Sequence, residues 1–510
     1  MANSAIESIA HPASTLPSIL HDSARVFPDE PYLVGPSGET MTRPELDSGA
    51  SQFANALLEL GLPERSAIGI FSPNSFDFVV AGYGILRSGH VFTPFNSSYK
   101  RRELLHQIRT SGATAVFVAS PLMETITDCG DELGECRVIE LDREFWREAS
   151  PSEPNVDGDR EKDVAFLPYS SGTTGLSKGV MLTQANLVAA IRQCLFTPGN
   201  TVGGVSMYCF LPLYHIYGFN VILNTALASG GSIHLRARFD MDDCLDTIER
   251  EGIEGLPTVP PVLLGLAARP DLAERDLTSL EWISCGAAPV SVAVCHRLRD
   301  TTGVPVRQGY GMTETAGIAT LNGVDGLHDP AASAGTAVEG LDVAIRDAET
   351  GDRSMAVDEV GEVVLHGPNI MLGYHGQPEE NARALRDGWF FTGDIGKIDS
   401  SGQLHIVDRK KEMIKYKGFQ VMPAELEGVM LELPEIRDCA VIGVKDPEAG
   451  EIPKAFIVLK PEADISAERI QEHVASQVAG YKKIRQVEFV ASIPRSPSGK
   501  ILRRMLIQGA

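Results

Sequence analysis

The segment Ser170-Ser171-Gly172-Thr173-Thr174-Gly175-Leu176-Ser177-Lys178-Gly179 decides both the fold and the chemistry that we expect of this chain. Its glycines let the backbone bend and bring N–H groups close to anionic oxygens. Its hydroxyl groups donate hydrogen bonds, and its lysine supplies a positive charge. Apolar residues 164–167 precede the segment and residues 180–182 follow it, so it is predicted to be a loop between two strands that wraps a polyphosphate.

The spacing of this loop excludes a Walker A motif. That motif reads G-x-x-x-x-G-K-[ST] and leads into a helix, whereas Gly172, Gly175 and Lys178 are spaced differently and a strand follows. A flexible Ser/Gly linker is the alternative interpretation. A linker, however, needs no apolar strand on each side.

The composition of the chain is that of an ordinary globular protein. Its 510 residues are 43% hydrophobic and 22% charged, which suggests about two to four domains. The net charge is −23, from 45 Lys and Arg against 68 Asp and Glu. Nucleic acids and anionic membranes need a basic surface, so neither is expected as a partner.

Cysteine usage and the N-terminal sequence indicate a reducing compartment. The eight cysteines form no C-x-x-C pair and no zinc-ligand spacing, so they are interpreted as small buried hydrophobic residues. The N-terminal residues lack a basic region followed by an apolar core, and no apolar stretch approaches the length of a membrane span. The expected location is therefore cytoplasmic.

The hydrophobic pattern predicts an α/β protein with a large N-terminal and a small C-terminal domain. Helices are expected at 46–60, 76–86, 184–193, 423–433 and 466–479, and strands at 67–71, 113–119, 206–211, 233–235, 440–444 and 455–460. The βα alternation implies a parallel sheet covered by helices. Residues 334–365 change to short strands with Gly and acidic turns, which indicates a β-rich subdomain. We place the large domain at 1–408, a hinge at 409–411 and a small α+β lid domain at 412–510.

A second glycine-containing motif is Gln308-Gly309-Tyr310-Gly311-Met312-Thr313-Glu314-Thr315, after a strand-like segment at 304–306. Its glycines allow a planar base to approach the backbone beside an aromatic face. Thr313 can reach a phosphate, and Glu314 can hold a metal ion that neutralises polyphosphate charge. Taken alone, the motif could be a glycine turn before an acidic helix start.

Three further segments have a functional and an ordinary structural interpretation. In Thr392-Gly393-Asp394, an acid after a glycine turn can bind ribose hydroxyls or simply form a turn. In Leu213-Tyr214-His215-Ile216-Tyr217-Gly218, a lone histidine is usually a satisfied structural residue. Near the C-terminus, Ser498-Gly499-Lys500 presents one lysine on a loop, with an apolar helix-like segment after it that argues against a frayed tail.

Together these segments, in this order, resemble the adenylate-forming superfamily of acyl- and aryl-CoA synthetases, firefly luciferase and peptide-synthetase adenylation domains. The resemblance covers nearly the whole chain. The segments Ile414-Lys415-Tyr416-Lys417-Gly418-Phe419-Gln420-Val421 and Leu211–Tyr217 look most like 4-coumarate–CoA ligase and luciferase.

The resemblance implies a role for each matching residue. Glu314 would hold Mg²⁺, Lys500 would bridge the carboxylate and the α-phosphate, and Asp394 would bind ribose with help from Arg409. The hinge would be Lys411, and Lys415 and Gln420 would face the active site after the small domain turns. His215 and Thr313 would stabilise charge. The ATP phosphates would lie on Ser170, Ser171, Gly172, Thr173, Thr174, Gly175 and Lys178, and the adenosine on Gly286, Ala287, Ala288, Pro289, Gln308, Gly309, Tyr310, Gly311, Met312 and Thr313.

The acyl pocket departs from the pattern of plant hydroxycinnamate ligases. Ser284 stands where those enzymes carry a lysine, and Val221 where they usually carry a serine. Loss of a cation and a hydroxyl makes the pocket more apolar, which favours an apolar aryl or medium-chain acid and a broad substrate range. The predicted lining is Tyr214, Tyr217, Gly218, Val221, Ser284, Gly309, Gly311 and Ala316.

The implied activity is that of an acid–CoA ligase that uses ATP, Mg²⁺ and coenzyme A. An enzyme that loads the phosphopantetheine of a carrier protein would use the same chemistry, although no carrier domain follows Lys500 in this sequence. Luciferase-like oxidation would need a dedicated luciferin pocket. A nucleotide-binding scaffold would not require Lys500, Glu314 and Asp394 together.

Overall fold

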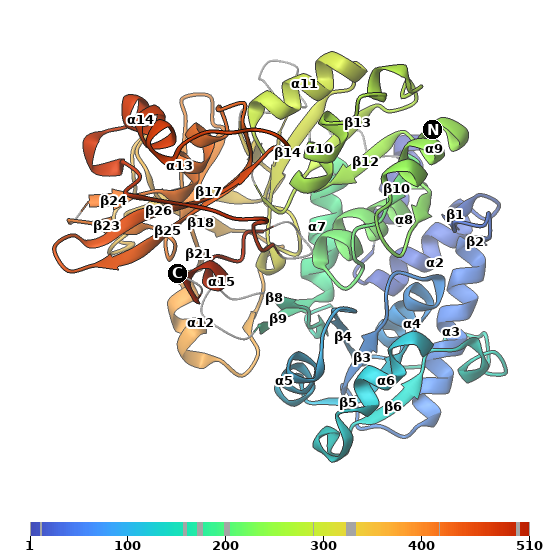
Figure 1. Cartoon of the computed structure of the whole chain (residues 1–510). Coiled ribbons are helices and arrows are strands. Elements are labelled where there is room, and N and C mark those ends of the chain that lie inside the picture. Colours follow the sequence, from blue (N-terminus) through green and yellow to red (C-terminus); the bar gives the residue numbers. More distant parts are fainter. Residues whose placement is uncertain are drawn as a thin grey trace.

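The computed structural model describes residues 2–10, 13–156, 161–170, 177–197, 204–288, 290–322, 333–417, 419–495 and 500–508. These residues form four β-sheets with helices packed on them (Figure 1). No helix among them is long and apolar enough to cross a membrane. All eight cysteines are free thiols, and all except the partly exposed Cys136 are buried, as predicted.

The first sheet contains the parallel core predicted for the N-terminal part of the chain. Its order is β19 (Gly373–Tyr374), β9 (Lys178–Thr183), β7 (Val164–Phe166), β4 (Val91–Phe95), β3 (Ala67–Phe71), β5 (Ala113–Val118) and β6 (Arg137–Glu140), with β8 (Tyr169–Ser170) paired to β9. Its helices are α3 (Arg43–Glu59), α4 (Phe76–Arg87), α5 (Arg101–Ser111) and α6 (Met123–Thr127). β8 and β9 are antiparallel, so Ser170 and Lys178 lie opposite each other.

The second sheet has nine strands, of which the central ones are parallel. Its order is β16 (Thr336–Ala337), β15 (Thr320–Leu321), β14 (Val306–Tyr310), β13 (Trp282–Cys285), β12 (Gly255–Thr258), β10 (Met207–Cys209), β11 (Ile233–Leu235), β1 (Pro31–Val34) and β2 (Thr40–Thr42). The helices of this part are α1 (Ala2–Ala10), α2 (Leu16–Val26), α7 (Gln184–Phe196), α8 (Thr225–Ser229), α9 (Met241–Glu251), α10 (Pro260–Ala267) and α11 (Val292–Thr302).

The third and fourth sheets are smaller. The third contains β17 (Asp342–Arg346), β18 (Gly361–His366), β21 (Trp389–Ile398), β20 (Leu385–Arg386) and β22 (Leu404–Arg409), with α12 (Pro378–Ala384) beside it. The fourth contains β24 (Phe419–Val421), β23 (Ile414–Tyr416), β26 (Gly450–Leu459), β25 (Ile436–Asp446) and β27 (Gln486–Phe489), with α13 (Pro423–Met430), α14 (Ala467–Gln477) and α15 (Arg503–Gln508). In Figure 1 the orange and red fourth sheet lies to one side of the first two sheets.

The predicted α/β class with a β-rich part and a small α+β part is confirmed, and one motif differs in detail. The strand expected at 304–306 begins at Val306 and runs through Tyr310. The reason is that Gly309 and Tyr310 pair with Leu321 and Thr320 of β15, which extends the strand. The residues Gln308 to Tyr310 are therefore strand residues and not a turn.

A cluster of three aromatic rings packs between the first two sheets, close to the chain around His215. Phe92 and Phe166 come from β4 and β7, and Phe219 comes from a π-helical segment, Tyr217–Asn224. The Phe166 and Phe219 rings stack at 4.8 Å with 20° between their planes, and Phe92 meets Phe219 edge-on at 5.5 Å. Because all three rings are fully buried, the segment after His215 has little freedom to shift.

Two asparagines fix the loop before this segment and the segment itself. Asn74 donates to the carbonyls of Leu211 and Arg236, each at 3.0 Å, and accepts the N–H of Leu213 at 2.8 Å. Asn220, inside the π-helical segment, donates to the carbonyl of Ala316 at 3.0 Å. Both amides are buried, so their hydrogen bonds hold the chain on either side of His215 in one position.

Separate apolar cores and one partly buried arginine organise the C-terminal part. The largest apolar cluster draws on residues from Ile9 to Leu404, and another runs from Ile414 to Ile484. Arg503 of α15 donates to both carboxylate oxygens of Glu427 at 2.7 and 2.9 Å and also pairs with Glu412. This arginine therefore ties the last helix to α13 and to the chain just after β22.

We predict that Arg503→Met destabilises the C-terminal part by about 3 kcal/mol, because it leaves two poorly solvated carboxylates without their cation. Chemical denaturation monitored in that part measures the change. The exposed Arg437 of β25 provides a matched control, Arg437→Met, with an effect within about 0.5 kcal/mol. A double variant, Arg503→Met with Glu427→Gln, should be less destabilised than the sum of the two single changes. Equal stability of Arg503→Met and wild type would contradict the prediction.

Candidate active site

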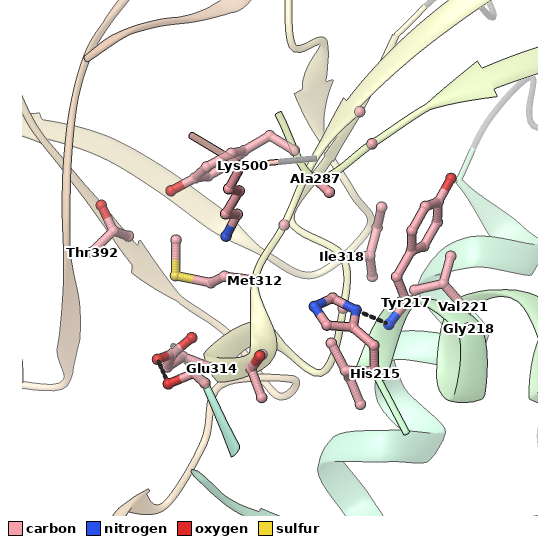
Figure 2. Close-up of a pocket in the computed structure, with 18 of the residues that line it drawn as sticks. His215, Tyr217, Gly218, Val221, Ala287, Met312, Glu314, Ile318, Thr392 and Lys500 are labelled. Atoms are coloured by element: carbon pink, nitrogen blue, oxygen red, sulfur yellow. Dashed lines mark hydrogen bonds between the residues drawn. The ribbon is translucent and has the colours of Figure 1, made fainter. Parts of the chain in front are cut away.

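A cavity of about 790 Å³ lies at the carboxyl ends of β12, β13 and β14 and is closed by residues from the first and third sheets and by Lys500. This is the edge of a parallel sheet where ligands usually bind, and the volume suits a ligand of nucleotide size. Figure 2 shows Lys500 and His215 pointing into the cavity from different sides, with Glu314 and Met312 in its wall. Residues distant in sequence, from Ser170 to Lys500, thus meet in one space.

Glu314 is a buried carboxylate that lines the cavity. It is 8% exposed, and its Oε1 accepts hydrogen bonds from the Ser170 hydroxyl and the Tyr374 hydroxyl, each at 3.0 Å. Thr313, next to it, is also buried and lines the same space. The first residue of the polyphosphate loop is therefore bonded directly to the acid of the second motif. Tyr374 was not predicted, because nothing local in the sequence marks it.

Lys178, at the other end of the polyphosphate loop, is held by a carboxylate and an aromatic ring. Its Nζ lies 2.6 Å from Glu380 Oε2 and 5.2 Å from the centre of the Tyr374 ring. Hydrogen bonding to Lys178 lowers the pKa of the Glu380 carboxyl. An anion that reaches Lys178 must share the lysine with Glu380 or displace that side chain. Glu380 comes from α12, about two hundred residues later, so the sequence offered no signal for it.

His215 is neutral in this site. The backbone N–H of Tyr217 donates to His215 Nδ1 at 3.2 Å, which in a neutral ring leaves the proton on Nε2 (Figure 2). Burial, helped by the charge of Lys500, lowers the pKa of His215 to about 4. At neutral pH this histidine is therefore a hydrogen-bond donor and not a cation.

Lys500 enters the cavity from the C-terminal part of the chain. Burial lowers the pKa of its ammonium group, and the nearby Arg409 lowers it further, while Asp394 and Glu314 oppose the shift. Lys415, on β23, is exposed and does not line the cavity. The described arrangement thus brings one of the two predicted C-terminal lysines to the site and leaves the other outside it.

Asp394 lies just behind the cavity wall. It is 3% exposed, accepts the Tyr310 hydroxyl proton at 2.7 Å and lies 3.1 Å from Arg409 Nε. Its charge raises the pKa of the Arg409 guanidinium, and burial with Asp394 raises that of the Tyr310 phenol. Its neighbours Thr392 and Gly393, not its own side chain, line the cavity.

The end of the cavity beneath the π-helical segment is mostly apolar. The Tyr217 hydroxyl lies 3.4 Å from the Ser284 hydroxyl, and Val221 and Ile222 line the wall beside them. Gly218 is required there, because a Cβ would lie 2.4 Å from the Pro212 carbonyl oxygen. This end has the character predicted for an acyl pocket.

Most of the predicted site residues that the structure describes line this cavity. They are Ser170, Lys178, Tyr214, His215, Tyr217, Gly218, Val221, Ser284, Gly286, Ala287, Gln308, Gly309, Tyr310, Gly311, Met312, Thr313, Glu314, Arg409, Lys411 and Lys500. Ala288, like Asp394 and Lys415, is not among the lining residues. The predicted residues Ser171, Gly172, Thr173, Thr174, Gly175 and Pro289, and the side chain of Gln420, lie outside the described part.

The prediction that Ala316 lines the pocket is wrong. Ala316 is fully buried, with a left-handed φ of +51°, and its carbonyl accepts the hydrogen bond from Asn220. This turn directs its methyl group into the core. Gly317 and Ile318 line the cavity in its place.

The described residues fit a Mg²⁺ ion bound together with phosphates better than a self-contained metal centre. No group of three or more His, Cys, Asp and Glu side chains within the described ranges could hold a metal. Glu314 supplies one carboxylate at the cavity wall, beside Thr313. Mg²⁺ is typically bound by one or two carboxylates plus substrate phosphates, which matches this donor set.

The fold and this cavity define an adenylate-forming enzyme, and the sequence comparisons agree. The model of the AMP-binding enzyme family matches residues 20–375, and that of the AMP-binding enzyme C-terminal domain matches residues 425–500. The chain belongs to the AMP-binding enzyme family. The predicted superfamily is therefore confirmed, as is the predicted class of AMP-forming acid–thiol ligase.

Its relatives include several named CoA ligases. A 4-coumarate–CoA ligase from Pinus taeda is 36% identical, over 94% of this chain and 92% of the relative. The peroxisomal OPC-8:0-CoA ligase 1 of Arabidopsis thaliana is 36% identical, over 94% of this chain and 90% of the relative. Among solved structures, the anthranilate CoA ligase AuaEII in complex with anthranoyl-AMP has a TM-score of 0.89 at 26% identity, with 97% of each chain covered. ATP-bound MatB from Rhodopseudomonas palustris has a TM-score of 0.88 at 29% identity, with 97% of this chain and 98% of MatB covered.

We predict that His215 makes stability depend on pH below neutrality. Its folded pKa of about 4 is below its unfolded value, so the unfolded chain takes up the proton first as pH falls from about 6.5. Between pH 7.5 and pH 5, wild type should therefore lose about 2 kcal/mol more unfolding free energy than His215→Asn. Urea denaturation at the two pH values measures this. Exposed His366 gives the control His366→Asn, which should behave as wild type. An identical pH dependence in His215→Asn and wild type would show that His215 is not held neutral.

Proposed function

We propose that this chain is an AMP-forming acid–CoA ligase for an apolar aryl or medium-chain carboxylic acid. The observation that carries the proposal is the meeting of Lys500 with Glu314, Ser170 and Lys178 in one cavity. A protein that only bound a nucleotide would need the loop and the acid. Carboxylate activation also requires a cation near the reacting phosphate and a separate apolar space for the acid. Lys500, from the C-terminal part of the chain, and the apolar end of the cavity meet these two requirements.

The first half-reaction joins the acid to the nucleotide. A carboxylate oxygen attacks the α-phosphorus of ATP, the bond to the β-phosphate oxygen breaks, and pyrophosphate leaves with the electron pair. Negative charge increases on the phosphate oxygens, and fixed donors and cations stabilise it. Lys500 supplies a cation close to the reacting atoms, while His215 and Thr313 supply neutral hydrogen-bond donors.

The remaining lining residues have binding roles in this proposal. Ser170, Lys178 and the loop between them hold the phosphates that leave. The ends of β13 and β14, with the chain after each strand, hold the adenosine, and Arg409 and Asp394 organise the ribose side. Glu314 would hold the Mg²⁺ ion, which when bound neutralises phosphate charge.

The second half-reaction transfers the acyl group to coenzyme A. The thiol sulfur attacks the acyl carbon, the bond from that carbon to the AMP oxygen breaks, and AMP leaves. We propose that residues 412–510 turn about the hinge at 409–411 between the two steps. Lys500 would then withdraw, and Lys415 and Gln420, on the β23–β24 hairpin, would face the cavity. The exposed position of Lys415 in the present arrangement supports its assignment to the second step.

The final acceptor and the acid are tested by one experiment. A panel of aryl and medium-chain acids is incubated with ATP and Mg²⁺, with and without CoA, and mass spectrometry detects the adenylate and the thioester. We expect both products for at least one acid. Adenylate without a CoA thioester for every acid would favour a carrier-protein thiol instead. A cytoplasmic location remains part of the proposal.

We predict that Lys500→Ala lowers the rate of ATP–pyrophosphate exchange at least about 100-fold, because a cation near the reacting phosphate is lost. Thioester formation from a supplied acyl adenylate should be largely kept. Lys415→Ala is the matched variant, and it should impair the second step more than the first. Equal loss of both half-reactions in Lys500→Ala would refute the assignment of Lys500 to one step.

A proline at the hinge should impair the second half-reaction more than the first, which is the opposite of the effect expected for Lys500→Ala. Lys411→Pro restricts the backbone torsion on which the turn depends. Thioester formation should fall at least about tenfold more than ATP–pyrophosphate exchange, measured in the same preparation. Lys411→Ala controls for loss of the side chain, since it keeps the backbone mobile. An unchanged thioester rate in Lys411→Pro would remove Lys411 from the hinge.

A further inference from the structure

The far end of the cavity carries two nitrogen donors from neighbouring strands of the second sheet. Residues paired in register across parallel strands point to the same face, as do residues two apart on one strand. Pro257, Ser284 and Arg307 are paired across β12, β13 and β14, and all three line the cavity. Arg307 therefore extends from the same sheet face as Ser284, on the side away from the carboxyl ends of the strands.

Arg307 has no counter-ion among the residues that the structure describes. Its Nε is buried and has no acceptor among the residues that the structure describes. Burial is the main cause that lowers the pKa of its guanidinium, and the one opposing influence is the exposed Glu281. The group nevertheless stays charged, as arginine does in proteins. A charged donor in a mostly apolar pocket needs a partner, which is either solvent or a ligand.

Trp282 adds a second donor beside it. Its side chain is 4% exposed and lines the cavity, and its indole Nε1 is buried with no acceptor within the described ranges. Gly255 on β12 makes room for this ring, because a Cβ there would lie 2.5 Å from Trp282 Cζ2. The absence of a side chain at Gly255 thus lets the indole ring pack on this face of the sheet without a steric clash.

These two donors affect which acid can fill the cavity. Trp282 Nε1 and Arg307 Nε are buried without an acceptor within the described ranges, and an apolar group at this end would leave both N–H groups unpaired, at a cost of about 1–3 kcal/mol each. An oxygen acceptor would satisfy them, and a carboxylate would match a guanidinium best, through charge and paired hydrogen bonds. The neighbouring Val221, Ile222 and Leu321 still suit a carbon body between the two ends.

The strand geometry sets the approximate length of that body. Arg307 and Tyr310 are three residues apart on β14, roughly 10 Å along the strand. The reacting carboxylate belongs at the Lys500 and Thr313 end. A benzene ring or a chain of several methylene groups spans such a distance, whereas a two-carbon acid does not.

We propose that the preferred acid carries an oxygen acceptor at its far end, best a second carboxylate, which Arg307 binds with the Trp282 indole N–H beside it. This inference rests on the proposed acid–CoA ligase function and specifies its substrate class. The carbon body remains aryl or medium-chain, and the polar group is confined to the end farthest from the phosphates.

The test compares acids that differ in that terminal group alone. ATP–pyrophosphate exchange is measured with octanedioic acid against octanoic acid, and with terephthalic acid against 4-methylbenzoic acid. Wild type should favour the acid with the second carboxylate in at least one pair. Arg307→Met should lower the kcat/KM ratio of that pair at least tenfold, and Trp282→Phe should lower it a few-fold. The exposed Arg299 of α11, outside the cavity, gives the control Arg299→Met, which should keep the wild-type ratio.

The outcomes separate this inference from the function on which it rests. Exchange with the monocarboxylic acids, and an equal ratio in wild type and Arg307→Met, would overturn the inference and leave the ligase function intact. Exchange with no carboxylic acid at all would overturn both. If Arg307→Met proves inactive with every acid, the same kcat/KM ratio is measured in Arg307→Lys and Trp282→Phe instead. An unchanged ratio in both of these variants overturns the inference, and a lowered ratio in either supports it.

Discussion

A buried carboxylate, Asp394, is the junction on which the site depends. It accepts the hydroxyl of Tyr310 from the second sheet and pairs with Arg409 at the end of β22, while itself belonging to β21 of the third sheet. An unpaired carboxylate at 3% exposure would cost several kcal/mol, so the three elements are held together strongly. Arg409 is also the last residue before the chain leaves the third sheet. The ion pair between Asp394 and Arg409 therefore fixes the point from which the chain continues into its C-terminal part.

The sequence predicted the elements whose pattern is local. The strand expected at 67–71 is β3, Ala67–Phe71, and the one at 233–235 is β11, Ile233–Leu235, because short buried apolar runs have clear ends. The loop motif and Lys500 were also found from composition and order. What the sequence did not reveal depends on pairing between distant segments. Tyr374 contacts Lys178 from β19, a distant segment that pairs with β9, and Glu380 contacts it from α12, and no local pattern marks either residue.

Errors in the predicted pocket have the same cause. Ala316 was assigned to the lining from its place in the motif, but a left-handed turn and the hydrogen bond from Asn220 direct it inward. Arg307 and Trp282 were overlooked, because an arginine before a glycine motif and a tryptophan in a strand have many ordinary uses. Their common orientation follows from the register of β13 and β14, which the sequence alone does not determine. Motifs thus located the reacting end of the cavity, and sheet pairing was needed to define the other end.

The position of α15 has a practical consequence. This helix begins three residues after Lys500, and its Arg503 is bound to the chain beside the proposed hinge. A polypeptide fused directly behind α15 would be carried with that helix and could obstruct its docking on β25. An affinity tag for purification is therefore better placed at the other terminus, and a fluorescent label attached to α15 would report the proposed movement of Lys500.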